Sequence, residues 1–192
     1  MKTVTVYCAS SSKIPDIYVE QARLLGKAMA SRGWSCINGA GNRGLMAEVS
    51  NAILSSGGTV TGIIPQFMVD EGWVHASLSE LIITENMHIR KQMMAERSDG
   101  CLTLPGGIGT FEELMEIITW KQLGLYKKPI VILNINGYYD DLLKMLQKAI
   151  DENFMHLRHQ EIFKVTSSVE ESLDFIAKTE EWLSNPRSIA AL

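Results

Sequence analysis

A glycine-rich stretch at residues 104–113 carries the residue types that most directly suggest chemistry. It reads Leu-Pro-Gly-Gly-Ile-Gly-Thr-Phe-Glu-Glu and follows an apolar run typical of a buried strand. Glycines let successive backbone N–H groups converge on an anion, and the N-terminus of the helix expected from about Thr110 adds roughly half a positive charge. The Gly-Lys-Ser/Thr of a nucleoside-triphosphate P-loop is missing, which favours a terminal monophosphate. We therefore expect a phosphate-binding loop that consists of Gly106, Gly107, Gly109 and Thr110.

Two adjacent carboxylates, Glu112 and Glu113, end this stretch. A carboxylate at the edge of a phosphate-binding loop lies within reach of a bound sugar. The structural alternative is a capping box, because Thr110 precedes Glu113 by three residues. Carboxylates in a first helical turn also complement the helix dipole. The residues alone leave both interpretations open.

A basic segment at residues 86–97 is expected to form a helix capped by Asn86. Four of its residues recur at helical spacing and share one face: Met87, Arg90, Met94 and Arg97. A face that mixes methionine with arginine suits a partly apolar anion, such as a base joined to a phosphorylated sugar. The alternative is a solvated face whose methionines fill the core.

A loop of small hydroxyl residues, 9–12, follows the first expected strand. Ser10 could donate a hydrogen bond to a phosphate or ribose oxygen. A turn bonded to its own backbone is the alternative.

Three glycines after the second expected strand, Gly39, Gly41 and Gly44, satisfy the Gly-x-Gly-x-x-Gly pattern of dinucleotide sites. That pattern usually follows the first strand, and it needs an acidic residue at the end of the next strand. Here the next strand ends in Pro65, which disfavours NAD. Gly41 is therefore expected to lie against a mononucleotide or phosphate, with tight strand-to-helix packing as the alternative.

Composition excludes several classes of protein. The 192 residues are 46% apolar, which excludes a disordered chain. The net charge of −4 does not favour binding of the chain to nucleic acid. No segment reaches the roughly 18 consecutive apolar residues of a membrane span. Three cysteines without metal-ligand spacing, Cys8, Cys36 and Cys101, are expected to be buried thiols in a reducing cytoplasm. We expect no metal, no cofactor and no nucleic-acid or membrane partner.

Short apolar runs alternate with helical periodicity along the chain. Strands are expected at 3–8, 34–37, 59–64, 81–84, 101–104, 130–133 and 162–166, and helices at 18–31, 45–55, 87–97, 111–125, 139–152 and 169–183. Asp16 is expected to cap the first helix, and residues 65–79 to form a loop or short helix over the strand ends. This pattern predicts an α/β fold, a doubly wound, mostly parallel, Rossmann-like sheet with helices on both faces. We expect one domain over residues 1–183 and a tail at 184–192.

Several motifs in this order resemble the LONELY GUY family. They are Gly44-Leu45-Met46, Gly62-Ile63-Ile64-Pro65, Met87-His88-x-Arg90-Lys91, Pro105-Gly106-Gly107-x-Gly109-Thr110-x-x-Glu113, Ile118-Thr119-Trp120-x-Gln122-Leu123-Gly124 and Asn134-x-x-Gly137-Tyr138-Tyr139. The family comprises cytokinin riboside 5′-monophosphate phosphoribohydrolases, often labelled possible lysine decarboxylases. Amino-acid decarboxylation needs an electron sink such as pyridoxal phosphate, and no lysine here stands in a distinctive setting for it.

The resemblance implies hydrolysis of the N-glycosidic bond of a purine nucleoside 5′-monophosphate to free base and ribose 5-phosphate. It implies that Arg90 and Glu113 are the catalytic pair and that the glycine loop holds the phosphate. Lys91 and Thr110 are expected to assist binding, and Met87 and Glu112 to contact the substrate. The family is typically dimeric, with active sites near the subunit interface.

One departure from the family pattern leaves the preferred base open. Family members commonly carry three consecutive glycines where this chain has Gly39-Ala40-Gly41, followed by the bulky Asn42 and Arg43. Two alternatives from other classes remain: a nucleotide-binding carrier or sensor that releases its ligand intact, and an NAD-dependent oxidoreductase.

Overall fold

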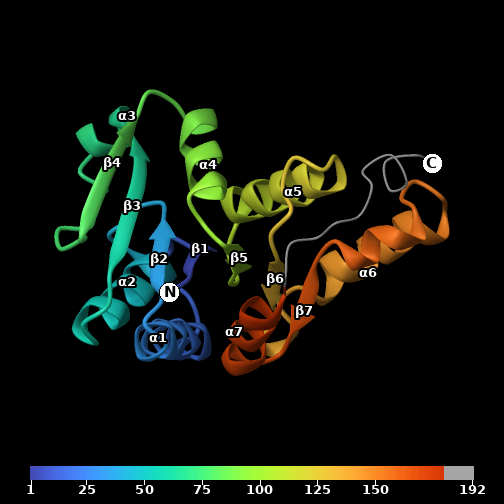
Figure 1. Cartoon of the computed structure of the whole chain (residues 1–192), viewed down its shortest axis with the longest axis horizontal. Helices are drawn as coiled ribbons and strands as arrows, with labels where there is room; N and C mark the ends of the chain where they lie inside the picture. Colours follow the sequence, from blue (N-terminus) through green and yellow to red (C-terminus); the bar gives the residue numbers. More distant parts are fainter. Residues whose placement is uncertain (180–192) are drawn as a thin grey trace.

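The computed structural model describes residues 1–179, which form a parallel sheet with helices on both faces (Figure 1). The strands are β1 (Thr3–Tyr7), β2 (Ser35–Asn38), β3 (Val60–Pro65), β4 (Glu80–Thr84), β5 (Gly100–Thr103), β6 (Ile130–Leu133) and β7 (Lys164–Thr166). The helices are α1 (Asp16–Ser31), α2 (Gly44–Ser55), α3 (Gln66–Asp70), α4 (Met87–Glu96), α5 (Ile108–Gln122), α6 (Asp140–Asp151) and α7 (Val169–Lys178), with short 3₁₀ turns at Ile135–Gly137 and Leu157–Glu161. The predicted doubly wound α/β fold is confirmed.

The strand order is β4-β3-β2-β1-β5-β6-β7, and each neighbouring pair is parallel. The direction of winding reverses between β1 and β5. The loops that follow these two strands therefore part at the sheet edge, which is where open α/β sheets bind ligands. The amide of Ala9 donates to the carbonyl of Pro105 at 3.1 Å, so the two loops remain joined at their base.

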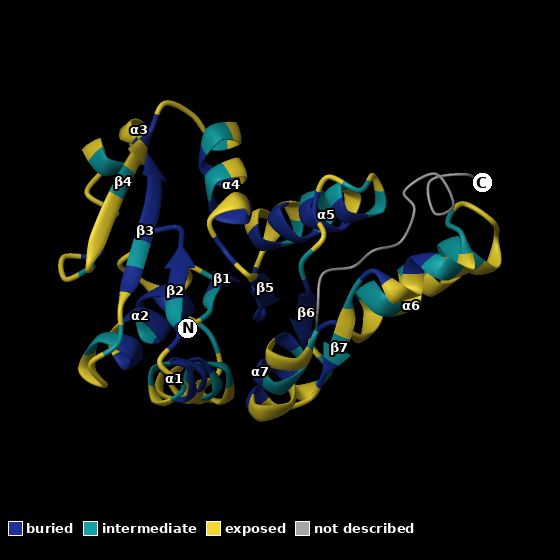
Figure 2. Cartoon of the chain, in the orientation of Figure 1, coloured by how far each residue is buried: buried dark blue, intermediate teal, exposed yellow. Residues whose placement is uncertain are grey.

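Two apolar layers enclose the sheet. On one face α1, α2 and α7 pack over side chains such as Val6 and Leu102, and on the other α4 and α5 pack over side chains such as Ile37 and Ile132. Figure 2 shows β1, β2, β5 and β6 largely buried, whereas α6 is exposed along much of its length. The three cysteines are free thiols within the core, as expected.

Some expected boundaries are wrong. Asp16 is the first residue of α1 rather than its cap, because Pro15 takes the cap position without a side-chain hydrogen bond. Asn86 does cap α4, its side chain accepting from the amide of Ile89 at 3.0 Å. The expected short helix over the strand ends is α3. The end of the helix expected at 169–183, the domain boundary at residue 183 and the tail 184–192 lie outside the described residues.

None of the described helices is long and apolar enough to cross a membrane. Across residues 1–179, no cluster of three or more histidine, cysteine, aspartate or glutamate side chains could hold a metal ion.

Helices α1 and α2 approach each other closely at Gly26. A Cβ at this position would lie 2.6 Å from the Cβ of Ala52 and 2.7 Å from the carbonyl oxygen of Val49. The carbonyl is backbone and cannot rotate away. The absence of a side chain at Gly26 therefore allows α1 to pack closely against α2, the helix that follows the loop after β2.

Replacing Gly26 by alanine should destabilise the protein although alanine favours helices by about 1 kcal/mol. The clash with α2 should lower the free energy of unfolding by about 1–3 kcal/mol, measured by urea denaturation. Lys27→Ala, at the exposed neighbouring position, is the control and should change it by less than about 0.5 kcal/mol. A Gly26→Ala variant more stable than the wild type would show that the two helices are not held at this distance.

Candidate active site

A cavity of about 640 Å³ opens beyond the carboxyl ends of β1, β2, β3 and β5. The loops after β1, β2 and β5 line it, together with α3 and the N-terminal parts of α2, α4 and α5. The lining residues are 8–11, Gly39, 41–43, Met46, Ile64, Met68, Trp73, Met87, Arg90, 107–110, Glu112 and Glu113. Of the predicted site residues, all but Lys91 and Gly106 line this cavity.

The N-terminus of α5 forms one wall. Its cap is Gly107, whose backbone is extended, and the first turn has neither a side-chain cap nor an acidic residue. The capping-box interpretation of Thr110 and Glu113 is therefore wrong, because the helix begins before Thr110. Instead the Thr110 side chain covers Gly106, where an added Cβ would lie 2.0 Å from its hydroxyl. Open space lies on the Cβ side of Gly107 and Gly109, so the uncapped helix end is accessible to an anion.

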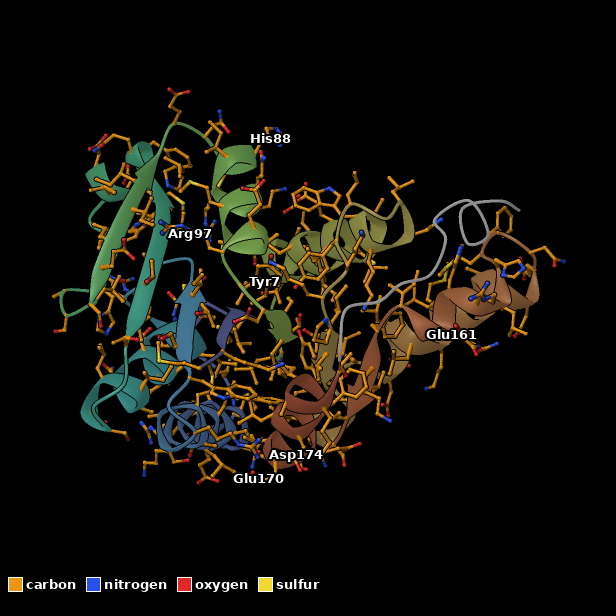
Figure 3. The ribbon with its side chains drawn as sticks, viewed as in Figure 1. Tyr7, His88, Arg97, Glu161, Glu170 and Asp174 are labelled. Carbon is orange, nitrogen blue, oxygen red and sulfur yellow. The ribbon has the colours of Figure 1, made fainter. Side chains whose placement is uncertain are left out.

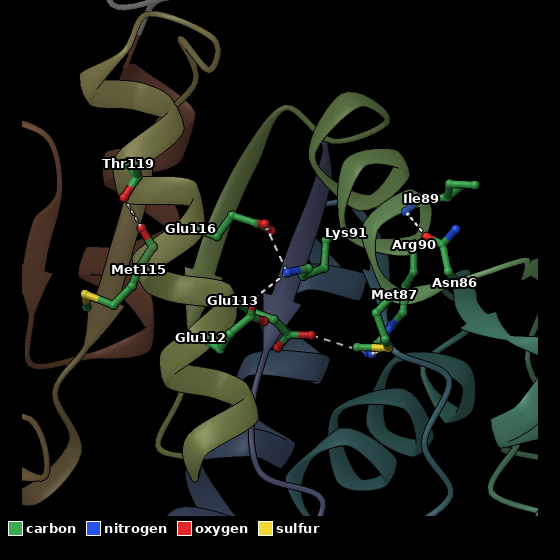
Figure 4. A network of polar contacts seen from close by, with 10 residues as sticks. All are labelled: Asn86, Met87, Ile89, Arg90, Lys91, Glu112, Glu113, Met115, Glu116 and Thr119. Carbon is green, nitrogen blue, oxygen red and sulfur yellow. Dashed lines mark hydrogen bonds and ion pairs between the residues drawn. The ribbon is translucent and has the colours of Figure 1, made fainter.

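The side chains of Arg90 on α4 and Glu113 on α5 face each other at the floor of the cavity (Figure 4). Arg90 Nη2 lies 3.4 Å from Glu113 Oε1, and the two side chains are only 6% and 9% exposed. Arg90 Nε donates to the carbonyl of Ile63 at 3.0 Å, and Nη1 contacts Met87 Sδ at 3.4 Å. These contacts fix the guanidinium while leaving the pair open to the cavity.

The absence of a side chain at Gly39 makes room for this arrangement. A Cβ there would lie 1.9 Å from Arg90 Nη2. A larger residue at position 39 would therefore displace the guanidinium of Arg90 from its present position.

Burial is the main influence on the protonation of Glu113. Removal from water raises the pKa of this carboxyl to about 7, against the opposing charge of Arg90. The negative charges of Glu112 and Glu116 contribute to this raised pKa, and the positive charge of Lys91 opposes it. A carboxyl with this pKa can accept or release a proton near neutral pH.

Lys91 points away from the cavity. Its ammonium group is buried between Glu112 and Glu116 of α5, in contact with the first and 3.0 Å from the second (Figure 4). Its predicted contact with substrate has no counterpart in this arrangement, in which Lys91 joins α4 to α5 beside the Arg90–Glu113 pair.

The face predicted along α4 is only partly presented to the cavity. Met87 and Arg90 line it, whereas Met94 is fully buried in the core. Arg97 caps the end of the helix and lies beside β4, where it approaches Glu80 at 3.9 Å (Figure 3). The ligand-facing part of this helix is therefore its first turn.

The loop between β2 and α2 closes against its neighbours through its glycines. Gly44 has a positive φ of 61°, and a Cβ there would lie within 2.7 Å of the backbone of residues 9–11. The tight packing that the sequence analysis gave as the alternative role of these glycines is thus present at Gly44. Gly41 lines the cavity. Ala40, at the middle position, adopts a φ of 63°, a conformation that favours glycine.

The segment between α3 and β4 contributes residues that the sequence analysis missed. A bridge pairs Gly41 with Val74, and the Asn42 amide donates to the Trp73 carbonyl at 3.0 Å. This pairing holds Trp73, together with Met68 of α3, against the cavity. These two contacts are made by the main chain, and the side chain of Asn42 adds a hydrogen bond to the carbonyl of Gly72 at 2.9 Å.

Comparison with known proteins places the chain in a family. A family model described as "Possible lysine decarboxylase" matches residues 46–176. A cytokinin riboside 5′-monophosphate phosphoribohydrolase of Arabidopsis thaliana is 41% identical, over 84% of this chain and 71% of its own length. A probable enzyme of the same name from Oryza sativa subsp. japonica is 37% identical, over 100% of this chain and 76% of its own length.

Solved structures agree on the fold. An X-ray structure from a structural genomics consortium has a TM-score of 0.71 and 26% identity, with 93% of this chain and 100% of that chain covered. A molybdenum cofactor binding protein from the bacterium Rippkaea orientalis has a TM-score of 0.71 and 22% identity, with 92% and 95% covered. At 22% identity the likeness shows the fold alone.

The raised pKa of Glu113 predicts how stability changes with pH. The folded state retains this proton up to about pH 7, whereas the unfolded chain loses it near 4.5, so stability falls as the pH rises through this interval. Between pH 5 and pH 8 the wild type should lose on the order of 1–3 kcal/mol of unfolding free energy that Glu113→Gln does not lose. Urea denaturation at both pH values measures the difference.

Glu85→Gln, which removes an exposed carboxyl outside the cavity, is the control and should follow the wild type. A Glu113→Gln variant whose stability changes with pH as the wild type's does would contradict the raised pKa.

Proposed function

The chain belongs to the family described as possible lysine decarboxylase, and we propose that it hydrolyses the N-glycosidic bond of a purine nucleoside 5′-monophosphate. The products are the free base and ribose 5-phosphate. The observation that carries this proposal is the buried Arg90–Glu113 pair beside an uncapped helix N-terminus in one cavity. The names of the relatives agree with it, as does the resemblance to the LONELY GUY family.

The 5′-phosphate binds at the start of α5, where the N–H groups of residues 106–110 and the helix dipole favour an anion. The position of Ser10 in the lining of the same cavity supports a hydrogen bond to phosphate or ribose. With the phosphate held there, the ribose extends over the floor of the cavity toward Glu113. The base is left to the apolar part of the lining, to which Met46, Met68 and Trp73 contribute.

Bond cleavage separates charge along the bond between C1′ of the ribose and the base. The ribose acquires oxocarbenium character and the leaving base becomes negative, as at the anomeric carbon in glycosidases. Ionised Glu113 stabilises the ribose cation and accepts a proton from the water whose oxygen bonds to C1′. That proton then passes to the departing base, so the reaction consumes one water and leaves the carboxylate unchanged.

Arg90 remains protonated throughout and offers a fixed set of donors. Its Nε is occupied by the carbonyl of Ile63, which holds the guanidinium plane in place. The N–H groups that are not directed at Ile63, Met87 or Glu113 are available to the ribose or to the departing base. Arg90 also keeps part of the Glu113 population ionised by opposing the effect of burial.

Replacing Glu113 by glutamine should abolish turnover while the fold persists, because the amide keeps the shape but cannot accept the proton. We expect a loss of at least about 10²-fold in kcat. The assay incubates the protein with AMP or isopentenyladenosine monophosphate and separates free base from nucleotide by chromatography. Glu20→Gln, on the exposed side of α1, is the matched control and should retain full activity.

A fully active Glu113→Gln variant would remove Glu113 from the mechanism. If the wild type binds nucleotide but returns it unchanged, the chain is a carrier or sensor. Binding of NAD alone would favour an oxidoreductase.

The protein also acts as a cytoplasmic homodimer in this proposal. Apolar side chains stand exposed on α6 and on the connection between α5 and β6, among them Met145 at 62% and Leu125 at 73%. Leu125 also lines a second cavity between α4 and α5 with Trp120. Exposed large apolar side chains are often part of a protein interface.

Leu125→Asp should shift the protein from dimer to monomer, because the partner would have to bury a carboxylate. Size-exclusion chromatography with light scattering measures the mass. Leu24→Asp places the same charge on α1, at a leucine that is 46% exposed, and should leave the dimer intact. A wild-type protein that is monomeric at micromolar concentration would exclude the proposed dimer.

A further inference from the structure

Arg43 is a charged residue of the cavity wall that the proposed reaction has not used. It immediately precedes α2, where it takes the cap position with an extended backbone. Its side chain is exposed and lines the cavity. Within residues 1–179 it forms no ion pair or side-chain hydrogen bond.

The other charged residues of the lining already have partners. Arg90 faces Glu113, and Glu112 is in contact with the ammonium group of Lys91. Within the described part of the chain, Arg43 is therefore the one charged lining residue whose charge is left for a ligand. An incoming anion meets no carboxylate that competes for this guanidinium at close range.

Contacts of the loop after β1 connect the position of Arg43 to the loop that precedes α5. The next residue, Gly44, packs against the backbone of residues 9–11, and Ala9 is hydrogen-bonded to Pro105. The helices α2 and α5 thus both begin at the cavity, on either side of the loop after β1. Neither has a side-chain cap or an acidic residue in its first turn.

We propose that Arg43 binds the phosphate of the substrate from the α2 side and selects ligands with a dianionic end. This inference rests on the proposed function. A phosphate monoester carries about −1.5 to −2 charges at neutral pH. Two helix N-termini of roughly half a charge each, together with one arginine, balance it closely. A neutral base offers Arg43 no such partner, which is why the phosphate rather than the base is assigned to it.

The test is direct binding, measured by calorimetry with ribose 5-phosphate and, separately, with adenine. Arg43→Gln should weaken binding of ribose 5-phosphate by roughly 10- to 100-fold, the effect of losing one charge-assisted hydrogen bond. Adenine binding should be unchanged. Arg43→Lys should restore part of the loss, because it keeps the charge without the planar fork. Arg23→Gln, at an exposed arginine of α1 outside the cavity, is the control and should bind as the wild type does.

Three results would overturn the inference: wild-type affinity of Arg43→Gln for ribose 5-phosphate, weakened binding of adenine instead, or no binding of ribose 5-phosphate by the wild type. Because Arg43 is exposed, the substitution leaves the packing of the core intact. The outcome is also separate from that of the hydrolysis assay. A wild type that cleaves no nucleotide but binds ribose 5-phosphate through Arg43 would overturn the proposed function and support this inference.

Discussion

The contact between a guanidinium and a carboxyl group, both removed from water, is the constraint on which the rest of the site depends. Arg90 and Glu113 come from two helices on the same face of the sheet, and each is almost fully buried. Burial alone would keep the carboxyl neutral, and the arginine partly reverses that preference. The result is a carboxyl group whose protonated and ionised states are close in free energy near neutral pH, at a position that is open to the cavity.

The sheet supplies the geometry for this contact. Because the strand order reverses between β1 and β5, the loops that follow them separate and leave an opening above the sheet. Helix α5 starts at that opening, so its unsatisfied N–H groups face the same space as the buried pair. The buried Lys91, paired with Glu112 and Glu116, joins α4 to α5 next to it. The N-terminus of α5 and the Arg90–Glu113 pair are thereby held together at one cavity.

Much of this arrangement could be predicted from the sequence. Apolar runs alternating with helical periodicity predicted the fold, and glycines after strands predicted which loops line the cavity. The start of α5 was misplaced because residues 106–109 contain three glycines, and glycine is disfavoured in helices. Lys91 follows Arg90 in sequence, but successive helical residues point about 100° apart, so its ammonium group lies against Glu112 and Glu116 and its role in binding stays a prediction. Residues 65–79 were expected over the strand ends, but Trp73 was not singled out as a site residue, because hydrogen bonds to the loop after β2 place it at the cavity.

The space left by the missing side chain at Gly39 also bears on how such a chain can change over time. A methyl group there would lie 1.9 Å from Arg90 Nη2, so any larger residue at position 39 would displace the guanidinium from its present position. If a larger residue replaced Gly39 during evolution, Arg90 would have to be replaced as well, or its guanidinium would move and lose its contact with Glu113. Substitution of this loop glycine is thus restricted by Arg90 on α4. The restriction would persist even if the nucleotide preferred by the pocket changed.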